Sequence, residues 1–235
     1  MHNHELNETF GQLTTPLVAD ACLRLKIPMR CAPPELRPLI AGIKIAGRVL
    51  PAVHFGSVDV FLEAMTAAEP GDVLVIDNGG RQDEACIGDL TALEAQARGL
   101  AGILVWGLHR DTADLERIGF PVFSTGRWPG GPQRLDPQTP QALERARCGE
   151  FTVTRDDVVF ADDDGAVFVP VGQAAAVLEA AQALWRTERR QAEEILSGKR
   201  LHEQLQFDDY LAKRTADPSY SFRQHLRAIG GAIEE

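Results

Sequence analysis

Pro70-Gly71-Asp72-Val73-Leu74-Val75-Ile76-Asp77 is the stretch of the sequence that decides the fold. A Pro-Gly turn leads into four consecutive apolar residues, a pattern that is typical of a strand buried on both faces of a parallel sheet. Residues 90 to 100 then place apolar side chains at helical spacing, and a second apolar run, Ile103 to Trp106, follows them. This order of strand, helix and strand predicts a wound α/β layer.

The same patterns extend outward from this layer in both directions. Helices are expected at residues 16–26, 60–68 and 112–118, and one long helix is expected from Gly172 to about Leu196. Strands are expected at 43–46, 49–53, 121–123, 151–153, 158–160 and 166–169, and the first two are predicted to join through Gly47. Residues 128–140 form a loop rich in proline and glycine.

Length and composition favour a single domain. The 235 residues are 44% hydrophobic, which is enough to bury a full core. We therefore expect one domain over residues 1–235, with 201–235 as a C-terminal extension that could pack on a neighbouring subunit. The sequence shows neither a signal peptide nor an apolar run long enough to span a membrane, so we expect a cytoplasmic protein.

The charge balance argues against two classes of partner. The chain has 24 Lys and Arg residues against 34 Asp and Glu residues, a net charge of −10, so its field should repel nucleic acid and anionic membranes. The four cysteines, Cys22, Cys31, Cys86 and Cys148, have no zinc-binding spacing. We expect them to be reduced thiols in the core.

Two segments carry the residue types that chemistry on a 2-keto acid needs. They are Gly88-Asp89-Leu90 and, after the next strand, Gly107 to Asp111. Ligands bind beyond the carboxyl ends of parallel strands, where we expect both segments to lie. Asp111 offers an oxygen ligand for Mg²⁺ or Mn²⁺, and Arg110 offers a permanent charge for a developing enolate. The backbone amides of Leu90 and Thr91 begin a helix and can bind a carboxylate.

A purely structural interpretation fits the same residues. Both Asp89 and Asp111 stand where a helix N-cap belongs, with Asp114 three residues after Asp111. An Arg-Asp pair in a loop is also usually a surface ion pair of little energetic consequence. Spacing alone leaves both interpretations open.

Other candidate sites are better explained by structure. The segment Asp77 to Gly80 lacks the order of a dinucleotide site and is predicted to be a tight turn lining the pocket. Asp162 to Gly165 lacks the spacing of a calcium loop, so it is predicted to be a hairpin turn. His54 and His109 are assigned structural or peripheral roles, because Arg110 next to His109 would disfavour its protonation.

The spacing of Asp89, Arg110-Asp111 and Asp114 resembles the signature of the 4-hydroxy-4-methyl-2-oxoglutarate aldolase family. That family also contains oxaloacetate decarboxylases and the regulator of ribonuclease E activity, RraA. The resemblance extends to further segments spread over residues 14–200, namely Asp20-Ala21, Pro70 to Val75, Gly119 to Phe123 and Ala161 to Gly165. Two regions depart from it: residues 154–157 replace a Pro-Gly-Asp turn, and the tail is longer.

The resemblance implies a fold, a site and an assembly. The fold is a three-layer RraA-like sandwich of the swivelling β/β/α type, with a central wound α/β layer and a long C-terminal helix. Asp111 would bind the divalent cation directly and Asp89 through a water, while Arg110 contacts the keto oxygen and the backbone at Gly88, Leu90 and Thr91 holds the carboxylate. The protein would be a homotrimer or hexamer, with sites completed by a neighbour's glutamate, for which the candidates are Glu188, Glu193 and Glu194.

Two functions follow from these observations. The first is a lyase, dependent on Mg²⁺ or Mn²⁺, that acts on 2-keto acids through a pyruvate enolate, by retro-aldol cleavage or by oxaloacetate decarboxylation. The alternative is a non-catalytic regulator of a ribonuclease, whose acidic surface binds a basic segment of that partner. The presence of Asp89, Arg110 and Asp111 together favours the lyase, since a binding surface has no need of a metal site.

Overall fold

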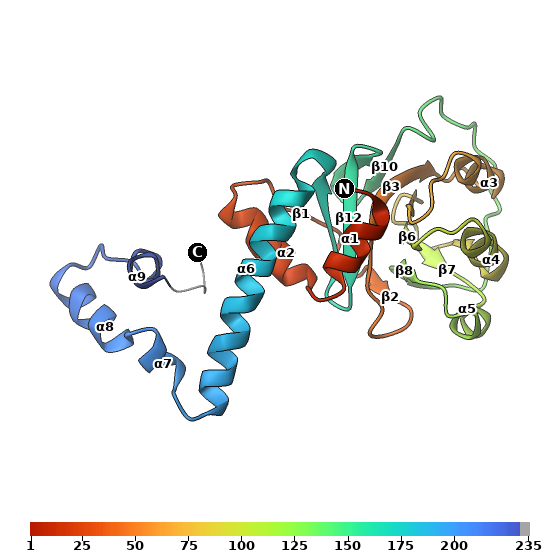
Figure 1. Cartoon of the computed structure of the whole chain (residues 1–235). Coiled ribbons are helices and arrows are strands. Elements are labelled where there is room, and N and C mark those ends of the chain that lie inside the picture. The colour runs from red at the N-terminus through yellow and green to blue at the C-terminus, as the bar shows by residue number, and fades with distance from the viewer. Residues whose placement is uncertain (231–235) are drawn as a thin grey trace. The chain divides into compact units, whose positions relative to one another are not determined.

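The computed structural model describes residues 1–230, and it divides the chain into two compact units. The first unit consists of residues 1–15 and 29–175, and the second consists of residues 16–28 and those from 176 onward (Figure 1). Every predicted site residue except the three C-terminal glutamates lies in the first unit. The expectation of a single domain stays a prediction.

An eight-stranded sheet forms the centre of the first unit. In their order across the sheet the strands are β1 (Arg30–Cys31), β13 (Gly165–Pro170), β12 (Asp157–Asp162), β3 (Ile45–Val53), β4 (Val73–Asp77), β6 (Gly102–Trp106), β8 (Val122–Ser124) and β2 (Arg37–Pro38). Strands β3, β4, β6 and β8 are parallel to one another, and the other pairings are antiparallel. The predicted wound α/β layer is confirmed.

The apolar runs became strands where expected, with one exception. All five residues of β4 are buried, and Val73 pairs with Gly102 of β6. The prediction of two strands joined through Gly47 was wrong, because β3 is continuous from Ile45 to Val53. A Cβ atom at Gly47 would lie 2.1 Å from the carbonyl oxygen of Gly71, so this glycine provides room for a neighbouring turn and does not break the strand.

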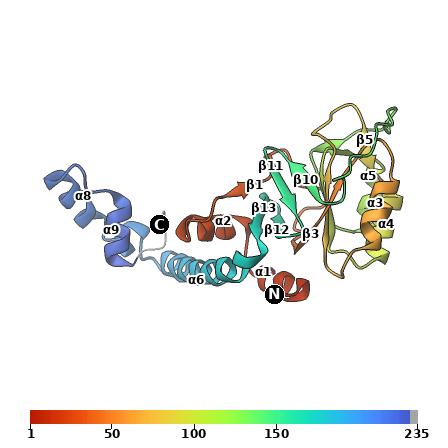
Figure 2. The same cartoon turned by 90° about the horizontal axis from the view of Figure 1, so that it is seen from above.

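Three helices cover one face of the parallel strands. They are α3 (Asp59–Thr66), α4 (Asp89–Ala97) and α5 (Thr112–Ile118), and they lie side by side in both views (Figures 1 and 2). Their buried side chains, including Phe61, Ala92 and Leu115, join Leu74 and Val105 of the sheet in one apolar core. This packing fixes the N-terminal ends of α4 and α5, where the predicted site residues stand.

Helix α1 (Asn3–Phe10) was not predicted from the sequence. Its Asn3 side chain donates to the carbonyl oxygen of Pro70 and the carboxylate of Asp72, and accepts from the amide of Arg48. These bonds join the helix to the turn before β4 and to β3. A polar side chain therefore anchors α1. A search for apolar periodicity alone does not detect such an anchor.

Two small sheets complete the first unit. Strands β5 (Ala85–Ile87), β7 (Leu108–His109) and β9 (Gly126–Arg127) form a parallel sheet, and β10 (Arg145–Cys148) and β11 (Phe151–Thr154) form an antiparallel one. Asp162 to Gly165 is the predicted hairpin turn between β12 and β13. Its Asp162 carboxylate accepts hydrogen bonds from both the backbone and the hydroxyl of Thr15.

The second unit is helical. It contains most of α2 (Thr15–Arg24) and of the predicted long helix α6 (Val171–Leu196), followed by α7 (Leu201–Gln204), α8 (Phe207–Ala216) and α9 (Phe222–Ile229). The aromatic rings of Tyr210, Phe222 and His225 pack together in the last two helices. No helix within residues 1–230 has both the length and the apolar character needed to span a membrane.

The four cysteines are free thiols, but they do not all lie in the core. Cys22, Cys86 and Cys148 are buried as predicted, whereas Cys31 is exposed. Cys31 stands on the two-residue strand β1 at the edge of the sheet, where Arg30 is partly buried and Cys31 is exposed. The prediction of a core thiol was therefore wrong at this position.

Candidate functional site

Adjacent strands of the small parallel sheet position the two predicted site segments. Gly88 and Asp89 follow β5, and Arg110 and Asp111 follow β7. The amide of Arg110 donates to the carbonyl oxygen of Ile87 at 3.0 Å, which holds the two segments side by side. The segments thus meet at carboxyl ends of parallel strands, as expected, but at those of β5 and β7 and not of the central strands β4 and β6.

A pocket of about 200 Å³ contains all the residues predicted from these two segments. Its lining includes Gly88, Asp89, Leu90, Thr91, Arg110 and Asp111. Val58, Pro132 and the strand β5 close its other sides. The structure therefore brings together, on one pocket, two predicted segments that are about twenty residues apart in the chain.

Asp111 has an unusual backbone conformation. Its φ of 58° and ψ of 37° place it in the left-handed region, which costs a non-glycine residue of order 1–3 kcal/mol. It occupies the N-cap position of α5, yet its side chain caps no helix amide. Asp111 is therefore the N-cap residue, as the structural interpretation expects, but its side chain does not act as the cap: the carboxylate lies on the pocket, 3.5 Å from Nε of Arg110.

Gly88 provides the space that the Asp111 carboxylate occupies. A Cβ atom at Gly88 would lie 2.2 Å from Oδ2 of Asp111 and 3.3 Å from Cγ of Arg110. The backbone of Gly88 is extended, with φ −152° and ψ −162°, so its conformation alone would admit any residue. Glycine is needed here because the carboxylate approaches the backbone so closely.

Asp89, in contrast to Asp111, does not occupy an N-cap position. Gly88 holds that position, and Asp89 is the first residue of the helix. Its Oδ1 accepts the amide hydrogen of Leu90 at 2.7 Å. This bond occupies one of the two amides predicted to bind a carboxylate, and it leaves the Thr91 amide in the first turn without an intrahelical acceptor.

A second pocket, of about 320 Å³, lies on the other side of Arg110 and Asp111 and adds a residue that the sequence analysis missed. It is lined by Arg110, Asp111, Thr112, Arg127, Trp128 and Pro129. Arg127 ends β9, the third strand of the small sheet, so the rule that located Asp89 and Asp111 applies to it too. Within the described part of the chain, no carboxylate forms an ion pair with Arg127.

His109 is held in the interior by two hydroxyl groups. Its Nδ1 lies 2.7 Å from Oγ of Ser124 and its Nε2 lies 3.2 Å from Oγ1 of Thr112. Burial lowers the pKa of His109, and the charge of Arg127 lowers it further. The charge named by the sequence analysis, that of Arg110, is not among these causes. A neutral imidazole with both nitrogens engaged fits the predicted structural role.

The turn from Asp77 to Gly80 has the predicted form but not the predicted place. Oδ1 of Asp77 accepts the amide hydrogen of Gly79, which closes the turn. Asp77 lines a different pocket, of about 350 Å³, together with Arg145 and Arg147. The prediction that this turn lines the pocket of Arg110 was therefore wrong, because the chain passes through Arg81 to Glu84 before it enters β5.

Two of the remaining predicted acidic residues, Asp114 and Glu194, have local partners. Asp114 pairs with Arg117 at 2.6 Å on the surface of α5. Glu188, Glu193 and Glu194 all stand on α6, where Glu194 pairs with Lys199 at 2.8 Å. Burial raises the pKa of Glu188, and the nearby charge of Asp20 raises it further.

The donor set at the pocket suits one kind of metal. Within residues 1–230 no group of three His, Cys, Asp or Glu side chains is gathered closely enough to hold a metal ion by itself. Such a group is typical of zinc, whereas Mg²⁺ and Mn²⁺ are often bound by one or two carboxylates together with waters and substrate oxygens. The carboxylates of Asp111 and Asp89 on one pocket fit this second pattern.

Comparisons with known proteins show the family of this chain. The family model for RraA-like proteins, described as Aldolase/RraA, matches residues 15–168. A protein of Halalkalibacterium halodurans named "Putative 4-hydroxy-4-methyl-2-oxoglutarate aldolase" is 32% identical over 121 residues, which are 52% of this chain. The aligned part spans 57% of that relative.

Two solved structures resemble the fold. An uncharacterized protein from Pseudomonas syringae pv. tomato aligns with a TM-score of 0.74 and 26% identity, over 85% of this chain and 96% of that one. RraAS2 of Streptomyces coelicolor, described as an unusual member of the RNase ES inhibitor RraA protein family, aligns with a TM-score of 0.66 and 26% identity. That alignment covers 84% of this chain and 98% of RraAS2. The predicted fold class is confirmed.

Proposed function

We propose that this chain, which belongs to the RraA-like family, is a divalent-metal-dependent lyase that acts on 2-keto acids through a pyruvate enolate. The observation that carries the proposal is the joint placement of Asp89, Arg110 and Asp111 on one pocket, next to a helix N-terminus. A relative that is 32% identical over 121 residues and is named "Putative 4-hydroxy-4-methyl-2-oxoglutarate aldolase" supports it. Retro-aldol cleavage of a 4-hydroxy-2-oxo acid and decarboxylation of oxaloacetate both yield the same enolate.

Arg110 is proposed to stabilise the charge that develops during cleavage. When the bond between C3 and C4 breaks, C4 leaves as CO2 or, once its hydroxyl has given its proton to a pocket water, as the second carbonyl product. The electron pair of the bond moves toward the keto group and leaves an enolate oxygen. The Arg110 guanidinium stays protonated throughout, so it can donate hydrogen bonds to that oxygen. Its side chain is half exposed on the pocket and thus within reach of a small substrate.

The first turn of α4 is proposed to orient the substrate. Its backbone amides, with the partial positive charge of the helix N-terminus, suit the carboxylate of the keto acid. Of these, the Thr91 amide has no intrahelical acceptor, and the Leu90 amide becomes available if Asp89 turns toward a cation. Gly88, at the N-cap, keeps side-chain atoms out of the same space.

Asp111 and Asp89 are the residues that would hold Mg²⁺ or Mn²⁺, Asp111 directly and Asp89 through a water. Such a cation supplies a Lewis acid that polarises the keto oxygen. The left-handed backbone of Asp111 places its carboxylate on the pocket, and Gly88, which has no Cβ atom, leaves the room for it. Proton transfer to and from substrate is assigned to a water in the pocket.

The assembly proposed is a homotrimer or hexamer, in which a neighbouring subunit adds a glutamate to each site. Glu188, Glu193 and Glu194 of α6 are the candidates. Of these, Glu188 has a raised pKa, which suits a group that exchanges protons. Replacement of each glutamate by Gln, with subunit mass measured by sedimentation, separates a catalytic loss from a loss of assembly.

The second candidate function is regulation of a ribonuclease without catalysis, because RraAS2, which shares the fold, is described as a member of an RNase inhibitor family. The net charge of −10 would suit a basic segment of such a partner. The two candidates separate in one assay of pyruvate release from oxaloacetate and several 4-hydroxy-2-oxo acids, with and without Mg²⁺ or Mn²⁺. Enzyme-free controls correct for decarboxylation by the metal alone. Release that requires both protein and metal supports the lyase, and no release from any substrate rejects it.

A further inference from the structure

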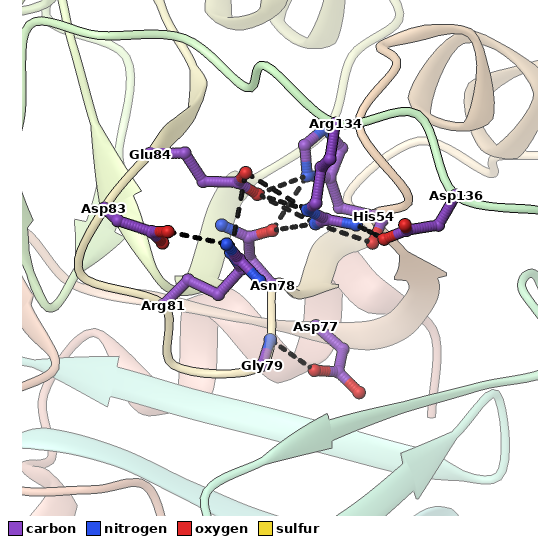
Figure 3. Close-up of polar contacts among 9 residues, drawn as sticks. All are labelled: His54, Asp77, Asn78, Gly79, Arg81, Asp83, Glu84, Arg134 and Asp136. Atoms are coloured by element: carbon purple, nitrogen blue, oxygen red, sulfur yellow. Dashed lines mark hydrogen bonds and ion pairs between the residues drawn. The ribbon is translucent and has the colours of Figure 1, made fainter.

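A buried polar network is formed by residues close in the chain to Ala85 and Pro132, which line the pocket. No step proposed above uses this network, whose side chains are drawn in Figure 3. Its central members are His54, Asn78, Glu84 and Arg134, called the Arg134 network below. His54, Asn78 and Glu84 are each less than 5% exposed. Arg134 stands in the loop of residues 128–140, and the other three come from the ends of β3, β4 and the segment before β5.

Arg134 makes a forked ion pair with Glu84. Its Nε lies 3.2 and 3.1 Å from the two carboxylate oxygens, and its Nη2 lies 2.8 Å from Oε1. The carboxylate is almost fully buried, so it depends on this guanidinium for its charge balance. Arg81 approaches from the other side at 3.5 Å but remains partly exposed.

The rest of the network fixes the orientation of Arg134. Nη2 also donates to Oδ1 of Asn78 at 3.1 Å and to the carbonyl oxygen of His54. Because this donor faces Asn78, the amide oxygen of Asn78 must point toward it. Nδ1 of His54, 2.8 Å from the same oxygen, must then carry the ring hydrogen. A neutral His54 agrees with burial, which lowers its pKa.

The loop that carries Arg134 also forms part of the site. The carbonyl oxygen of Gly130 accepts the amide hydrogen of Ala85, and the amide of Asp136 donates to Phe55, so the loop is attached on both sides of Arg134. Pro132 lines the pocket that contains Asp89 and Asp111. Nη1 of Arg110 lies 3.1 Å from where a Cβ atom of Gly131 would stand. A shift of the loop would therefore reach the pocket wall and Arg110.

We propose that Arg134 is a positioning residue, whose pairing with buried Glu84 locks the 128–140 loop in place as the wall of the substrate pocket. Arg134 does not line either pocket beside Arg110, so it acts through Pro132 and its neighbours. The role in catalysis rests on the proposed lyase function, whereas the locking of the loop does not. Without the guanidinium, Glu84 keeps only its longer ion pair with the partly exposed Arg81, so the cost of its burial favours an open loop that admits water.

The test compares Arg134→Met with Arg98→Met, both in the full-length chain. Arg98 makes a similar ion pair with Glu94, but at the exposed end of α4. Arg134→Met should raise the KM for a keto acid about tenfold, because the displaced loop carries Pro132 of the pocket wall, and the loss of kcat that reaches the chemistry through Arg110 should be smaller than this. Arg134→Lys should recover part of the loss, since a lysine restores the charge without the fork. Arg98→Met should match the unmodified chain.

A second measurement holds even if the chain has no lyase activity. Hydrogen exchange should become faster in residues 128–140 and at the Ala85 amide in Arg134→Met, and stay unchanged in Arg98→Met. Glu84→Gln should have the same effect, and the double variant should be no worse than either single one, as expected for partners in one interaction. Unchanged exchange in Arg134→Met would overturn the locking. Faster exchange with an unchanged KM in an active enzyme would overturn the positioning role.

Discussion

Gly88→Ala is the substitution for which the structure gives the sharpest expectation. The added Cβ atom would lie 2.2 Å from Oδ2 of Asp111, and ordinary van der Waals contact begins at 3.4 Å. The carboxylate must therefore retreat by about 1 Å, or the start of α4 must shift by as much. A misplacement of about 1 Å can cost about 10²-fold in rate, equivalent to about 2.7 kcal/mol.

The fold should tolerate the same change. The backbone of Gly88 is extended, and alanine at an N-cap costs at most about 1 kcal/mol relative to glycine. We therefore expect kcat/KM for pyruvate release to fall about 10²-fold, while thermal unfolding shifts by only a few degrees. Gly172→Ala is the matched control, because no atom lies within 4 Å of its added Cβ. If Gly88→Ala kept full activity at limiting metal, the assigned role of the Asp111 carboxylate would be wrong.

Three further predictions concern single side chains and pH. Arg110→Lys should lower kcat by at least about tenfold, as stopped-flow pyruvate detection can measure, because a point charge cannot reproduce the guanidinium fork at the enolate oxygen; an unchanged kcat would remove Arg110 from the chemistry. Arg127→Gln should raise the KM for anionic substrates several-fold and weaken the salt dependence of that KM, since Arg127 adds unpaired positive charge to the second pocket. The same KM and the same salt dependence in Arg127→Gln and in the unmodified chain would contradict this. Burial lowers the pKa values of His54 and His109 below the ordinary 6.5, so the unfolded chain binds more protons just below that pH. The free energy of unfolding should therefore fall as the pH drops below about 6.5, and His109→Asn should reduce that slope in denaturant titrations; a slope of the opposite sign would contradict the assignment.

The sequence predicted those elements of the fold whose own composition is sufficient to assign them. The apolar runs of β4 and β6 are buried on both faces, so their composition alone identifies them. Strands β5, β7 and β9 are two or three residues long and exist only because they pair with one another. Their residues have no periodicity that a single segment could show. The aromatic cluster of α8 and α9 was missed for a related reason. Its rings come from two short helices and form one cluster only after these helices pack together.

The acidic and basic residues of the candidate site could be proposed from the sequence. The backbone conformation, the space at Gly88 and the ion pair of Arg134 could not. Asp89 begins α4, and Arg110 and Asp111 stand just before α5; both helices were expected from the sequence, whereas the short strands β5 and β7 before these residues were not. The strain at Asp111 and the clearance at Gly88 depend on how closely two segments approach, which spacing along the chain does not reveal. Arg134 lies fifty residues from Glu84, its partner, and only the folded loop brings them together.

The most direct test of the central claim is calorimetry with oxalate, a planar dianion that mimics the pyruvate enolate, with and without Mg²⁺. We expect oxalate to bind the unmodified chain tightly only when Mg²⁺ is present. We also expect Asp111→Asn to remove this metal dependence and Arg110→Ala to weaken binding at saturating metal. Equal affinity of all three proteins for oxalate, with or without Mg²⁺, would contradict the claim that Arg110 and Asp111 form one site for an enolate and its cation.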